Sequence, residues 1–500
     1  MQTFRKTLLK LIVPVMLMTG IVLTSCESLL DIDAENTISG EVLKDDASIE
    51  EALVGAYYNL MGIYDGANGG ELLGGDFKLI PTLLTRRNNN EISWDDVNAP
   101  TYTNFIDKDI LRTNIRVEAN WRRAYEVLNT VNNVLANIDK VSDANLKNRL
   151  EGEALAIRGI LYFEMVRLWG PQYMDANLST PTIPLLTEPI TEIAEIKTPE
   201  LATLQAVYTQ VETDLNRAST LLQSFGTNGT NISYYAVTAY QMRVALQKLD
   251  WEAAEDHANT IISSGEFALA ATPLLAFNNN SNSTEDILAV QQTFANTTGD
   301  RSTGTGLVNH FSSLTESGIG TMRILEFSFY SSFVANSPQF SDNDIRSFVD
   351  EDVDETTRAQ DITTAFYTNV LNTSTISSSK FMSADKVIPV IRLAEIHLSR
   401  AEAIFEQTET IESTALADLN AIRTRAGLNA LEVSDFNGDP YAFYDSLVLE
   451  RNREFLFEGI IFHDLKRWKA YGLDVRITSN DPLDNKFILP IPQAELDTWD

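Results

Sequence analysis

Cysteine, histidine and basic residues are all scarce in this sequence of 500 residues. The single cysteine, Cys26, means that no disulfide can form within the chain. The four histidines, His257, His310, His397 and His463, share no metal-ligand spacing, and no HExxH motif occurs. Lys and Arg number 38 against 70 Asp and Glu, which gives a formal net charge of −32 at pH 7. A chain this acidic is a poor partner for nucleic acid and favours neutral ligands.

Long apolar runs are absent except at the N-terminus. A basic start is followed there by an apolar run from Leu11 to Leu23 and then by small residues before Cys26. The run is shorter than the ~20 residues that a bilayer-spanning helix needs, so residues 1–25 are predicted to be a cleaved export signal.

The tetrapeptide Leu23-Thr24-Ser25-Cys26 looks like a bacterial lipobox, in which the cysteine thiol is lipidated. We expect lipid attachment at Cys26, and the alternative is an ordinary signal peptide with an incidental cysteine. Two or more acyl chains would anchor the chain stably. Residues 26–46 are polar and acidic and are predicted to be a tether.

Apolar residues at intervals of three to four predict long helices in much of the remaining chain. The predicted helices span residues 118–138, 146–169, 199–222, 233–248, 251–263, 388–406, 411–426 and 442–468. Residues 233–263, with a tight junction at Leu249-Asp250, have the length of one tetratricopeptide unit. Helix pairs of this kind cannot bury their faces alone, so several should stack. The sequence therefore predicts a mostly α fold with tetratricopeptide-like helix pairs as its scaffold.

Two regions differ in composition from the predicted helices. Residues 65–105 are rich in Gly, Asn and Asp, and residues 270–385 are rich in Ser, Thr and Asn with short apolar runs. Both are predicted to be long loops with a few short strands laid over a single helical domain, residues 47–500. Long structured loops usually carry binding residues, so we expect ligand contacts in these two regions.

Several segments, taken in order, resemble the SusD/RagB family of outer-membrane nutrient-binding lipoproteins. They are Trp121-Arg122-Arg123-Ala124-Tyr125, residues 153–159 with Leu168-Trp169-Gly170-Pro171, residues 214–218, residues 388–395 with Ala401-Glu402-Ala403, residues 419–427, residues 450–454, Glu458-Gly459, residues 464–468 and Leu489-Pro490-Ile491-Pro492. Two features depart from the family pattern. Ile460-Ile461 stands where an arginine is usual, and the usual Asn-Pro-rich ending is missing, which suggests a truncated or divergent tail.

The resemblance implies a mostly helical lipoprotein in the outer membrane that faces the cell exterior. Members of the family cap a SusC-like TonB-dependent transporter and deliver oligosaccharides, or in some branches peptides, to it. The resemblance implies no catalytic role and no cofactor.

Sugar capture needs aromatic faces that stack on pyranose rings and polar groups that bind hydroxyls. In the 65–105 region these groups are supplied by Asp76, Arg86, Arg87, Asn88, Trp94 and Tyr102. By position they resemble the stretch that contacts ligand in family members. Phe329 or Tyr330 could add a further aromatic surface. Alternatively, Trp94 only anchors its loop to the scaffold.

Other charged residues are better explained as structural. The paired charges of the C-terminal third fall on helices that pack together, so they are predicted to form internal ion pairs. These residues are Arg392, Glu395, Glu402, Arg423, Arg425, Glu450, Arg451 and Glu454. Residues 435–439 resemble part of a calcium loop, but Ser446 stands where an EF-hand has its last glutamate, so a turn is predicted. A structural calcium ion is therefore not indicated.

The sequence thus predicts a glycan-binding lipoprotein that works with an outer-membrane transporter. Two alternatives stay open: an oligopeptide-binding uptake lipoprotein of the RagB kind, and a helical-repeat scaffold without a small ligand.

Overall fold

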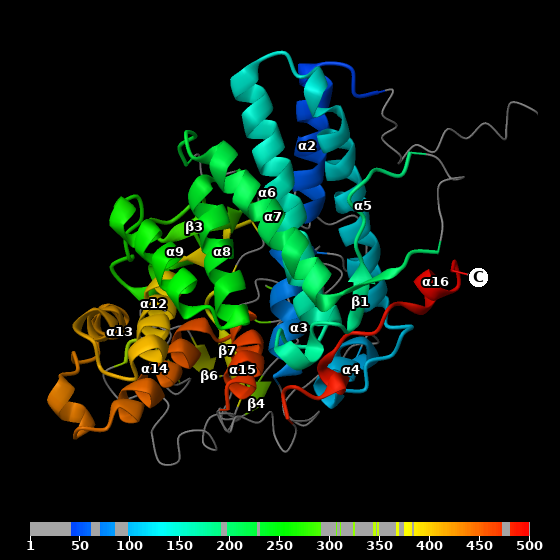
Figure 1. Cartoon of the computed structure of the whole chain (residues 1–500). Coiled ribbons are helices and arrows are strands. Elements are labelled where there is room, and N and C mark those ends of the chain that lie inside the picture. The colour runs from blue at the N-terminus through cyan, green and yellow to red at the C-terminus, as the bar shows by residue number, and fades with distance from the viewer. Residues whose placement is uncertain are drawn as a thin grey trace, which may run out of the picture.

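Helices make up most of the computed structural model (Figure 1), which describes residues 42–61, 71–85, 99–191, 198–227, 231–291, 307, 311, 324–325, 344–346, 348–349, 367–369, 375–382, 385–472 and 481–499. The α-helices are α2 (Asp46–Leu60), α3 (Asp76–Leu84), α4 (Ala99–Asp107), α5 (Ile115–Asn137), α6 (Ala144–Trp169), α7 (Leu204–Leu222), α8 (Tyr234–Lys248), α9 (Trp251–Ser264), α12 (Leu393–Thr408), α13 (Ser413–Arg425), α14 (Pro440–Phe455), α15 (Ile460–Ala470) and α16 (Gln493–Leu496). The strands are β1 (Pro181–Pro184), β2 (Leu201–Thr203), β3 (Asp286–Val290), β4 (Ile324–Leu325), β5 (Phe348–Val349), β6 (Tyr367–Asn369), β7 (Thr375–Ser378) and β8 (Ile388–Arg392). The predicted mostly α fold is confirmed.

The long helices α2, α5, α6 and α7 form one end of the molecule (Figure 1). Helix α6 is buried on nearly every side from Leu150 onward, because α2, α5, α7 and α8 all pack against it. Two glycines of α6 allow α7 to approach closely: a Cβ at Gly152 would lie 2.8 Å from Leu222 Cγ, and one at Gly159 would lie 3.1 Å from Leu215 Cγ. The apolar periodicity and these small residues together set the packing of the central helices.

Helices α8 and α9 form the predicted hairpin around Leu249-Asp250. Leu249 adopts the left-handed conformation with φ +60°, and Asp250 caps α9 by accepting a hydrogen bond from Ala253 N at 3.2 Å. Helix α9 packs against α12, and α12 packs against α13. The predicted stacking of tetratricopeptide-like pairs is therefore confirmed.

Two predicted helices begin later than the sequence suggested. Residues 388–392 form the buried strand β8, which pairs antiparallel with β3, Ile388 lying opposite Val290. A proline at 389 and β-branched neighbours favour a strand over a helix. Residues 201–203 likewise form β2, which pairs antiparallel with β1, so Thr203 rather than Pro199 marks the start of α7, and its side chain caps that helix.

The predicted helix over residues 442–468 is interrupted in the structure. Helix α14 ends at Phe455 and α15 begins at Ile460. Between them Phe457 and Gly459 both adopt positive φ angles, +70° and +79°. A continuous helix cannot contain left-handed residues, so the chain turns here and α15 packs against α3.

The prediction that residues 65–105 form a long loop is wrong for the part of this range that the structure describes. That part contains α3 and most of α4. Every residue of α3 is buried. The remaining described strands, β4 to β7, form one small sheet in the order β4-β7-β6-β5, within the region predicted to contain short strands.

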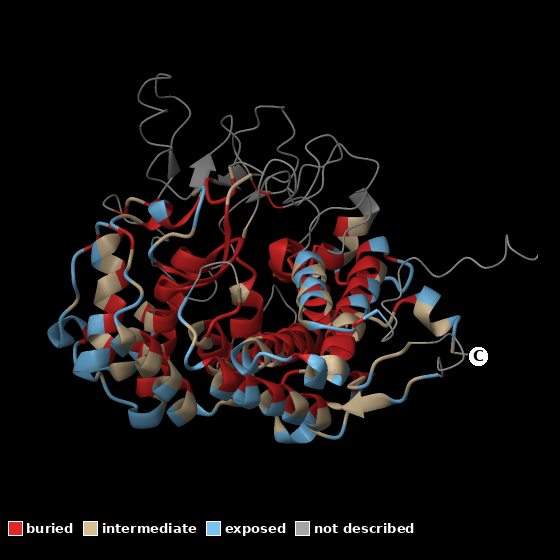
Figure 2. Ribbon diagram, turned by 90° about the horizontal axis from the view of Figure 1, so that it is seen from above, coloured by how far each residue is buried: buried red, intermediate tan, exposed pale blue. Residues whose placement is uncertain are grey.

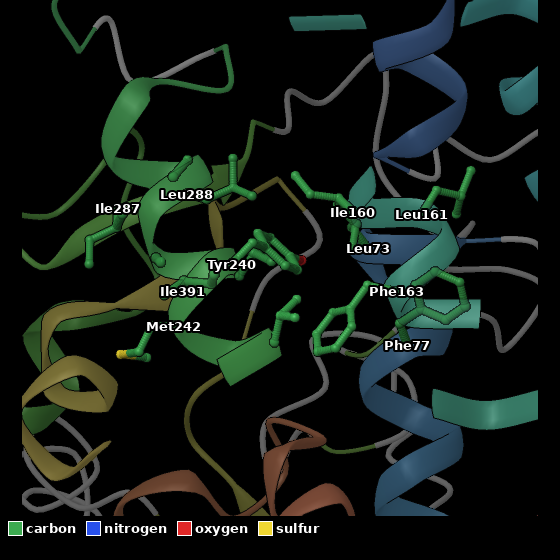
Figure 3. Packing of buried hydrophobic residues seen from close by; sticks show 14 of the residues in the cluster. Leu73, Phe77, Ile160, Leu161, Phe163, Tyr240, Met242, Ile287, Leu288 and Ile391 are labelled. Atoms are coloured by element: carbon green, nitrogen blue, oxygen red, sulfur yellow. The ribbon is translucent and has the colours of Figure 1, made fainter. Parts of the chain in front are cut away.

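Buried residues are concentrated in the middle of the molecule and exposed ones around its rim (Figure 2). Side chains from several elements meet in one apolar core (Figure 3), among them Phe163 of α6, Tyr240 of α8 and Ile391 of β8. Within the described ranges, no helix combines the length and the apolar character needed to cross a bilayer.

We predict that Gly459→Ala destabilises the fold far more than Gly265→Ala. Both glycines have positive φ, +79° and +70°, but a Cβ at Gly459 would lie 2.7 Å from Lys78 Cα, whereas nothing lies within 4 Å at Gly265. The left-handed conformation alone should lower the free energy of unfolding by about 1–2 kcal/mol in each variant. The clash should add about 1–3 kcal/mol at Gly459. Urea unfolding midpoints measure both changes, and equal losses would show that the contact with α3 is not tight.

Candidate functional site

Asp76 and Tyr102, two of the predicted ligand contacts, lie inside the protein. Asp76 is 0% and Tyr102 4% exposed. The Arg116 guanidinium pairs with Asp76 and donates a 2.7 Å hydrogen bond to the Tyr102 hydroxyl, and Asn120 Nδ2 donates to Asp76 Oδ2 at 2.9 Å. These side chains have no free face for a ligand, so the structure corrects both assignments. The Gly-, Asn- and Asp-rich composition of residues 65–105 predicted a loop, whereas Asp76 lies on α3 with its side chain in the core.

Glu71 lies beside this buried group and was not singled out from the sequence. Both of its carboxylate oxygens are buried, and no described residue donates a hydrogen bond to them. Burial, together with the nearby Asp76 carboxylate, raises the pKa of Glu71 to about 8. Glu71 therefore keeps its proton at neutral pH, which avoids a second negative charge next to Asp76.

The other predicted contacts, Arg86, Arg87, Asn88 and Trp94, lie outside the described residues, as do Phe329, Tyr330 and Cys26. The structure does define the two elements that flank residues 86–98. Helix α3 leads into this segment at Thr85, and α4 leads out of it from Ala99. The two helices pack against each other, so both ends of the segment are held on the scaffold.

A group of buried charges fastens the 270–385 region to the C-terminal helices, and we call it the loop-anchoring cluster. It consists of Glu285, Asp344, Arg346, Lys380, Arg392, Arg425, Glu450, Glu454 and Glu458. No side chain of the cluster is more than 4% exposed. Five carboxylates therefore face four cations in the protein interior.

Arg392, the last residue of β8, contacts three carboxylates of the cluster, those of Glu285, Glu454 and Glu458. Its Nη1 lies 2.6 Å from Glu454 Oε1 and 3.4 Å from Glu285 Oε2. Its Nε and Nη2 donate to the two oxygens of Glu458 at 3.0 and 2.9 Å. Arg425 also pairs with both Glu285 and Glu454. One strand, α14 and the α14–α15 junction are thus tied to each other by charge-assisted hydrogen bonds.

Arg346 and Lys380 connect the loop region itself to this cluster. Arg346 donates to both oxygens of Asp344 at 2.9 and 2.8 Å, and its Nη1 lies 2.7 Å from Glu450 Oε1 and 3.1 Å from Glu454 Oε2. Lys380 Nζ donates to Glu454 O at 2.6 Å and to Glu458 Oε1 at 2.7 Å. Residues far apart in sequence are therefore held together in the interior.

Burial and the neighbouring charges shift the pKa values of Glu454, Glu458 and Lys380. Burial alone would raise the pKa of Glu458, but the Arg392 and Lys380 charges outweigh it and lower this pKa to about 2. The pKa of Glu454 is held well below its usual range against burial, first by Arg425 and Arg392. Burial lowers the pKa of Lys380 to about 8, although Glu458 partly offsets this. Glu454 and Glu458 are thus kept in their charged form.

A second buried group confirms the predicted structural role of the C-terminal charges. Arg451 donates to both oxygens of Asp464 at 3.0 Å, and Arg467 pairs with Glu402 and Asp464. Glu402 also accepts a hydrogen bond from Trp468 Nε1 at 2.7 Å. All of these carboxylates are occupied by internal partners, so they are not placed for acid–base catalysis.

Residues 433–439 form the predicted turn rather than an ion site. A short 3-10 helix, Val433–Phe436, is followed by left-handed Asn437 and Gly438, and Asp439 caps α14 by accepting from Tyr441 N at 2.9 Å. Within the described ranges, no group of three or more His, Cys, Asp or Glu side chains could hold a metal ion.

The sequence indicated only part of the loop-anchoring cluster. Arg392, Arg425, Glu450 and Glu454 were predicted to pair internally, whereas Arg346 and Lys380 were not singled out. Little in the sequence indicated an internal role for these two residues. Each is a basic residue within a Ser-, Thr- and Asn-rich stretch of a chain that contains few basic residues. Their partners on α14, Glu454 among them, are more than 70 residues away in sequence, beyond the reach of any periodic pattern.

We predict that Arg392→Met lowers the free energy of unfolding by about 3–5 kcal/mol, because it leaves Glu454 and Glu458 buried with fewer compensating charges. The matched control is Arg122→Met. Arg122 lies 2.9 Å from Glu126 on α5, with side chains 56% and 42% exposed. This exposed pair contributes less than about 0.5 kcal/mol. Denaturant unfolding followed by circular dichroism compares the two, and similar small losses would show that the cluster does not hold the fold together.

Two family models match separate parts of the chain. Residues 291–499 match the model described as the SusD family, and residues 51–246 match the model described as starch-binding and associating with the outer membrane. Together the matches cover more than half of the chain.

Two curated relatives come from Formosa agariphila. SusD-like protein P2 is 25% identical over 431 residues, which are 76% of this chain and 78% of P2. SusD-like protein P38 is 23% identical over 259 residues, which are 50% of this chain and 44% of P38, so that match spans less than half of the relative.

Solved structures share the fold over nearly the whole length. A SusD superfamily protein from Bacteroides fragilis superimposes with a TM-score of 0.71 at 22% identity, covering 91% of this chain and 98% of the other. A laminarin-binding SusD-like protein superimposes with a TM-score of 0.63 at 21% identity, with the same coverage. With the family models, the curated relatives and the shared helical fold in agreement, the chain belongs to the SusD-like family.

Proposed function

We propose that the protein is a cell-surface lipoprotein that binds oligosaccharides and delivers them to a SusC-like TonB-dependent transporter in the outer membrane. The observation that carries the proposal is the match of two SusD-type family models over residues 51–246 and 291–499. A protein of the same fold is described as laminarin-binding, which supports a glycan as the ligand class. The role is binding rather than catalysis.

The ligand site would lie where residues 86–98 meet the scaffold. Trp94 would stack on a sugar ring, and Arg86, Arg87 and Asn88 would bind hydroxyl groups. This arrangement is supported by the packing of α3 against α4, the two helices that flank the segment.

Membrane attachment would be through Cys26 after removal of residues 1–25. Residues 26–46 would then act as the acidic tether, and α2 would begin the folded part at Asp46. The formal net charge of −32 suits a neutral glycan better than a polyanion.

We predict that calorimetric titration with a panel of neutral oligosaccharides, including laminarin fragments, gives saturable binding that Trp94→Ala weakens at least about tenfold, or ~1.4 kcal/mol. Loss of one stacking face is expected to have this size. Tyr102→Phe is the control. It removes a buried hydroxyl that accepts from Arg116 and should lower the melting temperature while leaving the affinity unchanged.

Each outcome of the titration separates the alternatives. Binding of mixed peptides without binding of sugars would identify an oligopeptide-binding protein instead. No binding in either panel would contradict the proposal and favour a scaffold that uses its helix pairs for protein contacts. Sugar binding that Trp94→Ala leaves intact would move the ligand site away from residues 86–98.

A further inference from the structure

Glu71 is a buried carboxyl group at the start of α3, and its surroundings suit an acid better than an anion. The side chain folds over Gly75: a Cβ at Gly75 would lie 2.8 Å from Glu71 Cβ and would overlap with Glu71 Oε2. Glu71 is 2% exposed, and both of its carboxylate oxygens are buried without a hydrogen-bond partner among the described residues. An ionised carboxylate in such a place lacks the donors that would compensate for its burial.

The neighbouring Asp76 carboxylate takes up the donors at this point of the structure. Arg116 pairs with it, Asn120 Nδ2 donates to Asp76 Oδ2 at 2.9 Å, and the backbone N–H of Glu71 donates to the same oxygen at 3.2 Å. The Arg116 guanidinium also donates to the Tyr102 hydroxyl at 2.7 Å. A carboxylate at Glu71 would therefore have to compete with Asp76 for Arg116.

Few charges face Glu71 from the elements packed around it. The short 3-10 helix Leu72–Gly74 follows Glu71 and packs against α2, α3, α5 and β8. Within the described ranges, the charges that act on Glu71 are those of Asp76 on α3 and Arg116 on α5, and neither α2 nor β8 adds another. Tyr102 of α4 also faces this group and stays neutral, because burial raises its pKa. One cation thus serves two carboxyl groups, which favours a proton on one of them.

The proton on Glu71 links the folded structure to pH. Burial, followed by the Asp76 charge, raises the pKa of Glu71 from its usual value of 4.5 to about 8. Between these two values the closed structure keeps a proton that an opened or unfolded chain has lost. The closed structure is therefore favoured most below pH 4.5, loses stability as the pH rises to about 8, and loses no more from this group above that pH.

We propose that Glu71 is a proton-dependent latch on α3, which holds this helix on the scaffold most firmly at acidic pH and less firmly as the pH rises through neutrality. With its proton, the side chain fits the closed space at Gly75. Without it, the carboxylate must leave this space or draw Arg116 away from Asp76. Either movement opens the junction at which α3 meets α5.

The position of the latch connects it to the proposed ligand contacts. Helix α3 ends at Leu84, just before residues 86–98. Loosening of α3 would therefore make the ligand site sensitive to pH, a consequence that rests on the proposed function.

Hydrogen–deuterium exchange of α3 tests the latch. Protection factors of residues 76–84 are measured over a range of pH, with the intrinsic pH dependence of amide exchange removed. Relative to Glu71→Gln, whose amide stays neutral, the wild type should lose protection of α3 by up to about tenfold per pH unit below about pH 8 and no further above it. The measurement needs no ligand, so its outcome is independent of whether the protein binds a glycan.

Glu51→Gln is the matched control, because Glu51 is an exposed glutamate on α2. This variant should follow the wild type at every pH. Parallel pH profiles of the wild type and Glu71→Gln would overturn the latch. If Glu71→Gln does not fold, the wild type decides by itself. Its α3 should lose protection between about pH 6 and about pH 8 while α7 keeps its own, and equal losses in both helices would overturn the latch.

Discussion

The pairing of Arg392 with Glu454 and Glu458 is the interaction on which the remaining C-terminal structure depends. It joins β8 to α14 and to the α14–α15 junction, and the side chains involved are at most 3% exposed. Removing charges from water is expensive, so such a group is tolerated only when each member is matched by partners of good geometry. Because Glu454 and Glu458 need cationic partners in the interior, Arg346, Lys380 and Arg425 must lie next to them. This requirement also positions the segments that carry these three residues.

The same constraint explains how a very acidic chain builds its interior. Among the described residues, 14 Lys and Arg side chains and 15 Asp and Glu side chains are buried. These charges nearly cancel, so the formal net charge of −32 resides on the surface and the rest of the chain. A larger share of the 38 basic residues than of the 70 acidic residues is therefore found buried, and the outside is left strongly acidic. This distribution favours solubility at a membrane surface and neutral ligands.

The helical scaffold could be predicted from the sequence because apolar periodicity is a local signal. The helices α5, α6, α8 and α9 and the junction at Leu249-Asp250 follow directly from it. The strand β8 was missed because a buried strand and a buried helix both contain a continuous apolar run, and the signals that favoured the strand, Pro389 and its β-branched neighbours, cover only a few residues. The break at residues 456–459 was missed because Phe457 gives no sign that it adopts a positive φ angle.

The candidate site was harder to predict, because a polar residue in a variable region can be either a ligand contact or a buried structural group. Asp76 and Tyr102 proved to be the latter, since Arg116 lies 40 and 14 residues away and only the fold brings it to them. The internal role of Arg392 and Glu454 was predicted because both fall on packed elements. The roles of Arg346 and Lys380 depend on partners that are distant in sequence and could not be read from it.

Hydrogen–deuterium exchange of Glu454→Gln tests the central claim, that buried ion pairs fasten the loop region to the helical scaffold. Glu454 contacts Arg346, Arg392 and Arg425, so its neutralisation weakens these three ion pairs of the cluster without removing volume. The account predicts faster exchange in residues 375–382 and 385–392, with unchanged exchange in α5, α6 and α7. Equal acceleration throughout the chain, or no change in these two segments, would contradict it.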